Sequence, residues 1–244
     1  MVFFNVRESF SEKKPPKILI MVISQNGKHK RWNYEKENWL KKFKPKDSIS
    51  LELIECDNMV NENFIHSYHC IESYKPGIFQ KTILTMQSNI DKYDYFVRTN
   101  LSTFVIQDRL KSYLTHLNQS NVYDGVYCNK NANWIAGWGV VLDKNTCNML
   151  IQHGIKEENF NKRVSDDVLI GKILKSHNVQ CNTKHRAHLG YAWKYNKTIK
   201  ENIESIQQNP NVMFIRLTQR GLDKDMIKKE KYTNALNTLY EVFG

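Results

Sequence analysis

Residues 92 to 105, KYDYFVRTNLSTFV, decide the fold of this 244-residue chain. The stretch begins with aromatic and apolar residues and then turns polar at Arg98, Thr99, Asn100 and Ser102. A short apolar and aromatic run of this kind is typical of a buried strand. Polar side chains directly after such a strand lie at the sheet edge where α/β proteins bind their ligands. The stretch therefore predicts a central strand that ends in a functional site.

Strands and helices are predicted to alternate on both sides of this stretch. Apolar or alternating runs predict strands at residues 18–23, 49–56, 95–99, 125–128, 134–142, 179–183 and 212–217. Amphipathic patterns predict helices after residue 27, from 77 to 90, from 109 to 117, after Asp143, from 166 to 176, and at the C-terminus. This order predicts an α/β sandwich, with ligands bound past the carboxyl ends of the strands. We expect a loose N-terminal arm over residues 1–16 and a single domain over residues 17–244.

Composition narrows the class of protein. The longest apolar run is about seven residues, far short of the roughly 20 needed to cross a bilayer, so no membrane span is expected. The start, MVFFNVRESF, lacks the basic region and small-residue cleavage site of a secretory signal. We therefore expect a cytoplasmic protein. The excess of lysine over arginine and the abundance of asparagine favour an AT-rich genome, such as that of a large DNA virus, for which the location would be the host cytoplasm.

The cysteines and the net charge leave more classes of protein open than the hydrophobicity does. Five widely spaced cysteines without a CxxC pair favour reduced thiols over a disulfide framework or a zinc site. The net charge of +11 is concentrated near the N-terminus. It fits a solvated lysine-rich surface, or a surface that attracts a polyanion such as nucleic acid or a sugar diphosphate.

Two further motifs lie downstream of the strand. Residues 134–142, WIAGWGVVL, carry a glycine pair that marks either a bulge or a close approach of backbone to ligand. Ser165, Asp166 and Asp167 form a good helix start, because Ser caps free amides and acids complement the helix dipole. Taken alone, the glycine pair can be explained as a bulge and the acidic segment as an ordinary helix start, without any role in function.

Together the three motifs resemble, in order and at compatible distances, those of the fringe and β-1,3-galactosyltransferase class of GT-A glycosyltransferases. Residues 92–105 are similar to that class's YDY(F/V)-basic-T-DDD-TFV strand, residues 134–142 to its SGxGYVLS stretch, and residues 165–171 to its EDVYVG motif. The resemblance implies a GT-A type fold, which is a Rossmann-like mixed sheet flanked by helices, and inverting sugar transfer. It also implies that Asp167 is the base that deprotonates the acceptor hydroxyl, with Asp166 as its neighbour.

The chain departs from that class at one decisive point. Asn100, Leu101 and Ser102 stand where the class has three aspartates that hold Mn²⁺ or Mg²⁺. Neutral oxygens bind hard cations poorly, so we predict no metal ligands and no required cofactor, with Mn²⁺ or Mg²⁺ binding weakened. Cationic side chains such as Arg216 and Arg220 would then stabilise the leaving diphosphate.

The resemblance implies a set of donor-binding candidates. For Lys81, a solvated position on an amphipathic helix is an equal alternative. A lone histidine is more often structural, so His185 and His188 each have that alternative. The candidates are Ser24, Arg31, Lys81, Arg98, Thr99, Asn100, Ser102, Gly137, Trp138, Gly139, Asp166, His188, Arg216 and Arg220.

The expected function is that of a hexosyltransferase-type enzyme that uses a UDP- or GDP-sugar donor and a glycan or other hydroxyl acceptor. A first alternative is an inactive nucleotide-sugar or glycan-binding module on the same fold. A second is a basic nucleic-acid-binding protein, although the chain has no RRM, KH, zinc-finger or helix-turn-helix signature. We expect no stable nucleic-acid partner.

Overall fold

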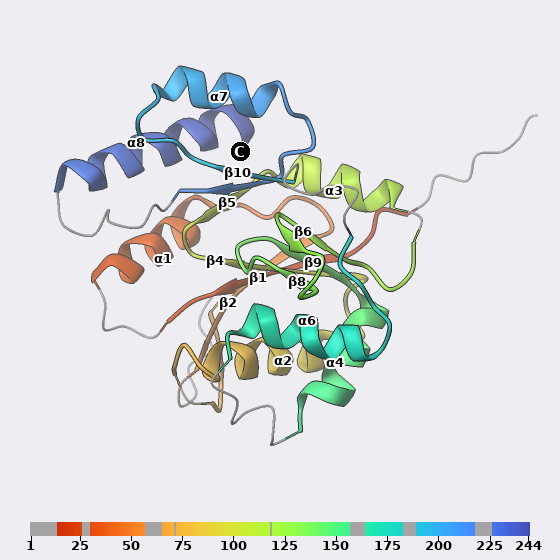
Figure 1. Ribbon diagram of the computed structural model, residues 1–244. Helices are drawn as coiled ribbons and strands as arrows, with labels where there is room; N and C mark the ends of the chain where they lie inside the picture. The colour runs from red at the N-terminus through yellow and green to blue at the C-terminus, as the bar shows by residue number, and fades with distance from the viewer. Residues whose placement is uncertain are drawn as a thin grey trace, which may run out of the picture.

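A six-stranded sheet forms the centre of the computed structural model (Figure 1). Its strands are β1 (Ile18–Ile23), β2 (Ile49–Cys56), β3 (Ile65–Tyr68), β4 (Tyr95–Asn100), β6 (Tyr123–Gly125) and β9 (Val140–Asp143), in the order β3-β2-β1-β4-β9-β6. The structure describes residues 14–25, 30–56, 65–70, 72–117, 119–156, 164–182, 189–217 and 226–244, without the side chains of 30–33 and 226–229.

The sheet is parallel on one side and antiparallel on the other. β1 runs parallel to β2 and β4, with Ile18 opposite both Ile49 and Tyr95, and β2 runs parallel to β3. β9 runs antiparallel to both β4 and β6. All six residues of β1 are buried, because helices cover both faces of a parallel sheet, and this explains its uninterrupted apolar run.

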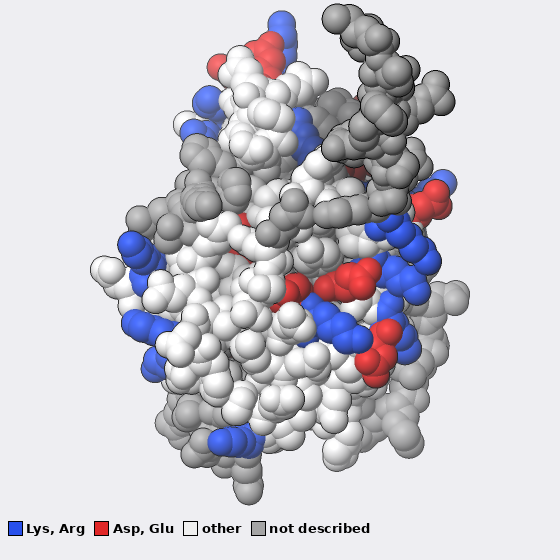
Figure 2. Space-filling model, turned by 90° about the vertical axis from the view of Figure 1, so that its right-hand side faces the viewer, with Lys and Arg blue, Asp and Glu red and all other residues white. Residues whose placement is uncertain are grey.

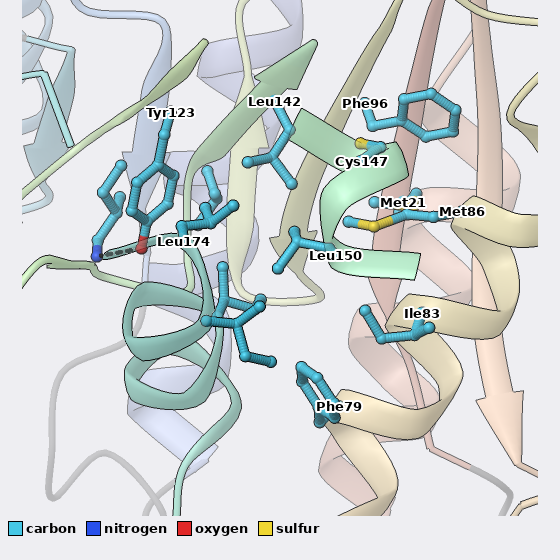
Figure 3. Close-up of a cluster of buried hydrophobic side chains, with 14 of the residues drawn as sticks. Met21, Phe79, Ile83, Met86, Phe96, Tyr123, Leu142, Cys147, Leu150 and Leu174 are labelled. Carbon is cyan, nitrogen blue, oxygen red and sulfur yellow. Dashed lines mark hydrogen bonds between the residues drawn. The ribbon is translucent and has the colours of Figure 1, made fainter. Parts of the chain in front are cut away.

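Helices α2 (Gly77–Asn89), α4 (Lys144–Gly154) and α6 (Asp166–Ser176) cover one face of the sheet, the lower one in Figure 1. The core between them joins Met21 of β1 to Phe79 and Ile83 of α2 and Leu150 of α4 (Figure 3). The cap of α4 follows the sequence prediction, since the Asp143 carboxylate accepts a hydrogen bond from the Thr146 amide at 2.9 Å.

The opposite face carries α1 (Lys30–Lys42), α3 (Gln107–His116) and a second, three-stranded sheet (Figure 1). The strands of that sheet are β10 (Gly190–Ala192), β11 (Phe214–Arg216) and β5 (Thr103–Val105). Helices α7 (Ile199–Gln207) and α8 (Met226–Phe243) pack on its outer side through a core that includes Ile206, Leu236 and Leu239. A short hairpin, β7 (Cys128–Asn129) with β8 (Trp134–Ile135), completes the described fold.

The predicted fold class is confirmed: the chain is a single α/β domain with a mixed sheet between helices. Strands β1 and β2 have the predicted bounds, and β4 extends one residue further, to Asn100. Of the expected N-terminal arm, residues 1–13 lie outside the described part of the chain. None of the described helices is both long and apolar enough to span a membrane.

Three predicted strands are wrong. Residues 134–142 form two strands, β8 and β9, with a turn at residues 137–138 between them. The predicted strand at residues 125–128 is instead the end of β6 and the start of β7. Residues 179–182 form no strand. The sequence pattern also missed β3, β10 and α7, which are short and locally indistinct. Ser165 stands at the N-cap position of α6, but its side chain makes no capping hydrogen bond.

The prediction of five reduced cysteines is also wrong. Cys56 and Cys70 form one disulfide, and Cys128 and Cys181 form another. Cys147 is a free, buried thiol. The paired cysteines are 14 and 53 residues apart in the sequence. Each disulfide joins two segments that become neighbours only when the chain folds, so the spacing alone does not predict it.

Candidate functional site

A cavity of about 610 Å³ opens where the carboxyl ends of β1 and β4 meet the first turn of α6. The turn between β8 and β9, the segment before α2, and the end of β11 complete its wall. Its lining residues are Ile23, Ser24, Gln25, Glu72, Ser73, Tyr74, Ile78, Lys81, Arg98, Asn100, Leu101, Ser102, Trp134, Ala136, Gly137, Trp138, Asp166, Asp167 and Arg216. The predicted strand end and the predicted acidic helix start therefore face the same space.

A buried ion pair joins these two motifs. Nη2 of Arg98 lies 2.5 Å from Oδ2 of Asp166, and both side chains are about 5% exposed. Burial raises the pKa of Asp166, and the Arg98 guanidinium opposes that rise. Nε of Arg98 has no hydrogen-bond partner among the described residues, although it is buried. This buried pair therefore has one N–H that no described residue accepts.

Gly137 makes room for this guanidinium. A Cβ atom at position 137 would lie 2.0 Å from Nη1 of Arg98, so any side chain there would displace Arg98. Thr99 fixes the same turn from the other side, because its Oγ1 donates to the Trp138 carbonyl at 3.0 Å. The glycine of this motif is therefore required by a long-range contact with the neighbouring strand.

Asp167 follows the ion-paired Asp166 but faces the cavity. It is half-buried, and its Oδ1 accepts a hydrogen bond from the Val168 amide at 2.8 Å. No ion pair of Asp167 occurs among the described residues, whereas Asp166 is held by Arg98. Of the two adjacent acids, Asp167 is thus the one whose carboxylate is available to a ligand in the cavity.

A second cation, Lys81 of α2, lies at the end of β1. Its side chain is 1% exposed, and its Nζ donates to the Ser24 carbonyl at 2.6 Å and to Glu72 at 2.7 Å. Burial lowers the pKa of Lys81, and the Glu72 carboxylate opposes that effect. Ser24 in turn donates to Glu55 at 2.6 Å, and Glu55 pairs with Lys36. The alternative of a solvated Lys81 is wrong, because the network buries it beside the cavity.

The turn at residues 100–102 is held by local and long-range hydrogen bonds. Oδ1 of Asn100 accepts from the hydroxyls of Ser102 and Thr103, both at 2.9 Å. The Leu101 carbonyl accepts from the indole N–H of Trp39, and the Ser102 carbonyl from the Leu217 amide. This oxygen of Asn100 is therefore already engaged in shaping the turn.

The residues of this turn do not fit a divalent cation. Mn²⁺ and Mg²⁺ prefer anionic oxygen ligands, and the turn offers only amide, hydroxyl and carbonyl oxygens. In the part of the chain that the structure describes, no group of three or more His, Cys, Asp or Glu is arranged to hold a metal ion. Of the acids at the cavity, Glu72 and Asp166 are already paired with Lys81 and Arg98.

The structure brings most of the predicted site residues together. Of the predicted residues whose side chains the structure describes, Thr99 and Gly139 do not line the cavity. Thr99 is fully buried, and a Cβ at Gly139 would lie 2.4 Å from Val126 and 2.8 Å from Phe214. Gly139 therefore allows close packing, and Thr99 holds the turn through its hydrogen bond to the Trp138 carbonyl. The predicted residues that do line the cavity are Ser24, Lys81, Arg98, Asn100, Ser102, Gly137, Trp138, Asp166, Asp167 and Arg216.

Other candidates cannot be placed at the cavity. His185, His188 and Arg220 lie outside the described residues, and Arg31 lies on α1 with a side chain that is not described. Sequence reasoning missed Glu72 and Tyr74, which enter from the segment before α2 and belong to no recognisable motif. It also passed over Trp134 as a site residue, although Trp134 opens the glycine motif.

The described charges do not form a continuous basic surface on the face shown in Figure 2. Lys and Arg side chains lie there beside Asp and Glu side chains, and large areas carry neither. This mixed pattern on that face gives no support to a nucleic-acid groove, which is lined by clustered Lys and Arg.

No family model matches this chain, and no curated protein matches it. Among solved structures it is similar to the apo form of the glycosyltransferase GlyE of Streptococcus pneumoniae TIGR4, with a TM-score of 0.48, 11% identity, and coverage of 93% of this chain and 64% of that one. It is also similar to the mannosyltransferase PcManGT of Pyrobaculum calidifontis in complex with GDP-Man and Mn²⁺, with a TM-score of 0.48, 11% identity, and coverage of 96% and 66%.

A third similar structure is a glycosyltransferase involved in the glycosylation of the major capsid of PBCV-1, with a TM-score of 0.44, 10% identity, and coverage of 90% of this chain and 98% of that one. This chain spans slightly less than two thirds of the first two structures. At such low scores and identities these likenesses assign no activity to this chain.

Proposed function

We propose that this chain is a GT-A type glycosyltransferase that moves a hexose or similar sugar from a nucleotide-diphosphate sugar to an acceptor hydroxyl, with inversion and without a required metal. The observation that carries the proposal is the pairing of acids and cations around one cavity. Asp167 faces the cavity without an ion-pair partner among the described residues, while Asp166 is engaged by Arg98. The resemblance of the same residues to three glycosyltransferase motifs supports the assignment.

The reaction needs a base, and Asp167 fits that role. Its carboxylate takes the proton of the acceptor hydroxyl as the acceptor oxygen forms a bond to the anomeric carbon. On the opposite side of that carbon, the bond to the diphosphate oxygen breaks. The electron pair leaves with the nucleoside diphosphate, so one glycosidic bond forms, one phosphoester bond to the sugar breaks, and the configuration inverts.

Negative charge develops on the departing diphosphate, and cations stabilise it. Lys81, Arg98 and Arg216 all line the cavity. Glu72 and Asp166 are ion-paired with Lys81 and Arg98, so the diphosphate competes with these carboxylates for the two cations. Preorganised cations of this kind act strongly in a site from which water is excluded. They supply the charge that a metal ion would supply at a turn carrying aspartates, and a UDP- or GDP-sugar is the donor class that fits them.

Asp167→Asn tests the base directly. The amide keeps the size of the side chain but cannot take the acceptor proton, so the transfer rate should fall by about 10²- to 10⁴-fold while donor affinity changes little. Rates are measured with a panel of nucleotide sugars and acceptor glycosides, and affinity is measured by calorimetry. Asp108→Asn is the matched control, because Asp108 is an exposed acid in the first turn of another helix, α3.

The results separate transfer from mere binding. If Asp167→Asn transfers sugar at a rate close to that of the wild type, Asp167 is not the base. Binding of a nucleotide sugar by the wild type with no turnover for any acceptor or water would favour a nucleotide-sugar or glycan-binding module.

A further inference from the structure

We propose that the hairpin β7–β8 binds a pyranose ring of the acceptor against the aromatic pair Trp134 and Tyr127. The inference rests on the proposed function, because it places the acceptor beside Asp167 as the base. It goes further by naming the acceptor class, a saccharide, and the surface that holds it.

The two rings form a surface that the core does not use. Trp134 is only partly buried and lines the cavity, and Tyr127 is 40% exposed. Their ring centroids are 5.6 Å apart, with an angle of 49° between the planes. The next residue, Ile135, is fully buried, so the alternation of the strand directs Trp134 away from that core. Such rings bury the apolar C–H face of a sugar and leave its hydroxyls free.

The packing of α6 brings Asp167 next to this surface. A Cβ at Gly171 would lie 1.9 Å from the carbonyl oxygen of Asn133 and 3.0 Å from Cα of Trp134, so the helix touches the hairpin backbone there. Asp167 precedes Gly171 by four residues and lies on the same face of the helix, one turn nearer its N-terminus. Trp134 and Asp167 therefore line the same cavity from two backbone segments that touch, which is the arrangement that an acceptor ring on Trp134 and a base at Asp167 require.

The hairpin is held rigidly by the residue before Trp134. Asn133 is 1% exposed and adopts a left-handed backbone conformation, with φ 52°. Its Nδ2 donates to the carbonyls of Gly171 and Val179 at 2.9 and 3.0 Å, and its Oδ1 accepts from the Cys181 amide at 2.7 Å. The Cys128–Cys181 disulfide ties the other strand of the hairpin to the same segment. A binding surface fixed in this way loses little conformational entropy when a ligand binds.

Uncharged aromatic rings suit a neutral sugar ring better than a diphosphate. Lys81 is hydrogen-bonded to the Ser24 carbonyl just after β1, and the Arg98 guanidinium lies against Gly137 and is paired with Asp166. The proposal therefore assigns the diphosphate to these two cations and the acceptor ring to the hairpin. The competing occupant of Trp134 is the nucleobase of the donor, which the experiment distinguishes.

The test measures saccharide and nucleotide binding separately. Saturation-transfer difference NMR is recorded with methyl β-D-galactopyranoside, methyl β-D-glucopyranoside, methyl α-D-mannopyranoside and methyl α-L-rhamnopyranoside, and calorimetry with UDP and GDP. Trp134→Ala should weaken the best-bound glycoside by about tenfold, and Trp134→Phe should restore most of that loss. Tyr127→Ala should act in the same direction as Trp134→Ala. Tyr93→Ala, which removes a half-buried ring just before β4 and outside the cavity lining, is the control and should change glycoside affinity by less than about twofold.

The inference is overturned if no glycoside binds the wild type, or if glycoside affinity is unchanged in Trp134→Ala and Tyr127→Ala. It is also overturned if Trp134→Ala weakens UDP or GDP instead of the glycoside. These readings need no turnover. Failure of the proposed function would give a different result: the wild type would bind a glycoside through Trp134 but would transfer no sugar to it.

Discussion

At the scale of single residues, Arg98 is the side chain on which both the site and its stability depend. It is the ion partner of the buried Asp166 and the cation nearest the Gly137 turn. Removing one partner of a buried ion pair leaves an uncompensated charge, so Arg98→Ala should lose about 3 kcal/mol of unfolding free energy near neutral pH. Denaturant unfolding measures this loss.

The loss should depend on pH. Burial already raises the pKa of Asp166, and Arg98 opposes the rise, so the variant raises that pKa further. A carboxyl whose folded-state pKa lies above its unfolded value loses stability as pH rises through that range. The deficit of Arg98→Ala should therefore be smaller at about pH 5 than at about pH 8. Arg98→Ala combined with Asp166→Asn should recover part of it, and an equal deficit at both pH values would contradict this account.

Residue-scale prediction from sequence succeeded where a residue's neighbours in the chain define its place. Asp166 and Asp167 begin a helix, and the structure separates them into one paired and one cavity-facing acid. Sequence prediction failed where a role depends on the folded course of a loop. Glu72 accepts hydrogen bonds from Lys81 of α2 and from the Cys56 amide at the end of β2, and no sequence pattern around residue 72 predicts these contacts.

At the scale of elements, Asn133 joins the hairpin β7–β8 to α6. Asn133→Ala removes three buried hydrogen bonds and leaves the carbonyls and amide of its partners unsatisfied, which should cost about 3 kcal/mol of unfolding free energy. Asn121→Ala is the matched control, because Asn121 is also an asparagine with positive φ but is exposed. Thermal and denaturant unfolding compare the two. Similar losses in both variants would show that backbone conformation, and not the hydrogen bonds, fixes the hairpin.

The same region shows why one element was mispredicted. Residues 134–142 have the composition of a strand, and the two glycines read equally well as a bulge. The structure breaks the stretch into β8 and β9 because Arg98 occupies the space beside Gly137 and Thr99 holds the Trp138 carbonyl. These contacts come from β4, about 40 residues earlier in the chain, so local periodicity cannot reveal them.

At the scale of the whole molecule, the alternation of strands and helices predicted the α/β class, but it predicted neither the order of the strands in the sheet nor the covalent cross-links. If Cys56–Cys70 and Cys128–Cys181 form in the purified protein, a thiol titration of the denatured, unreduced chain should find one thiol, Cys147. The same titration after reduction should find five. Five thiols without reductant would contradict the disulfides and would agree with the predicted cytoplasmic location, since disulfides persist in oxidising compartments.

The central claim is that cationic side chains, and not a metal ion, support sugar transfer in the cavity beside Asp167. The most direct measurement is release of UDP or GDP from a panel of nucleotide sugars, with acceptor glycosides present, in excess EDTA and again with added Mn²⁺ or Mg²⁺. The account predicts turnover in EDTA at a rate within about twofold of that with metal, because the turn at residues 100–102 offers only neutral ligands. Turnover that EDTA abolishes and Mn²⁺ restores would contradict it.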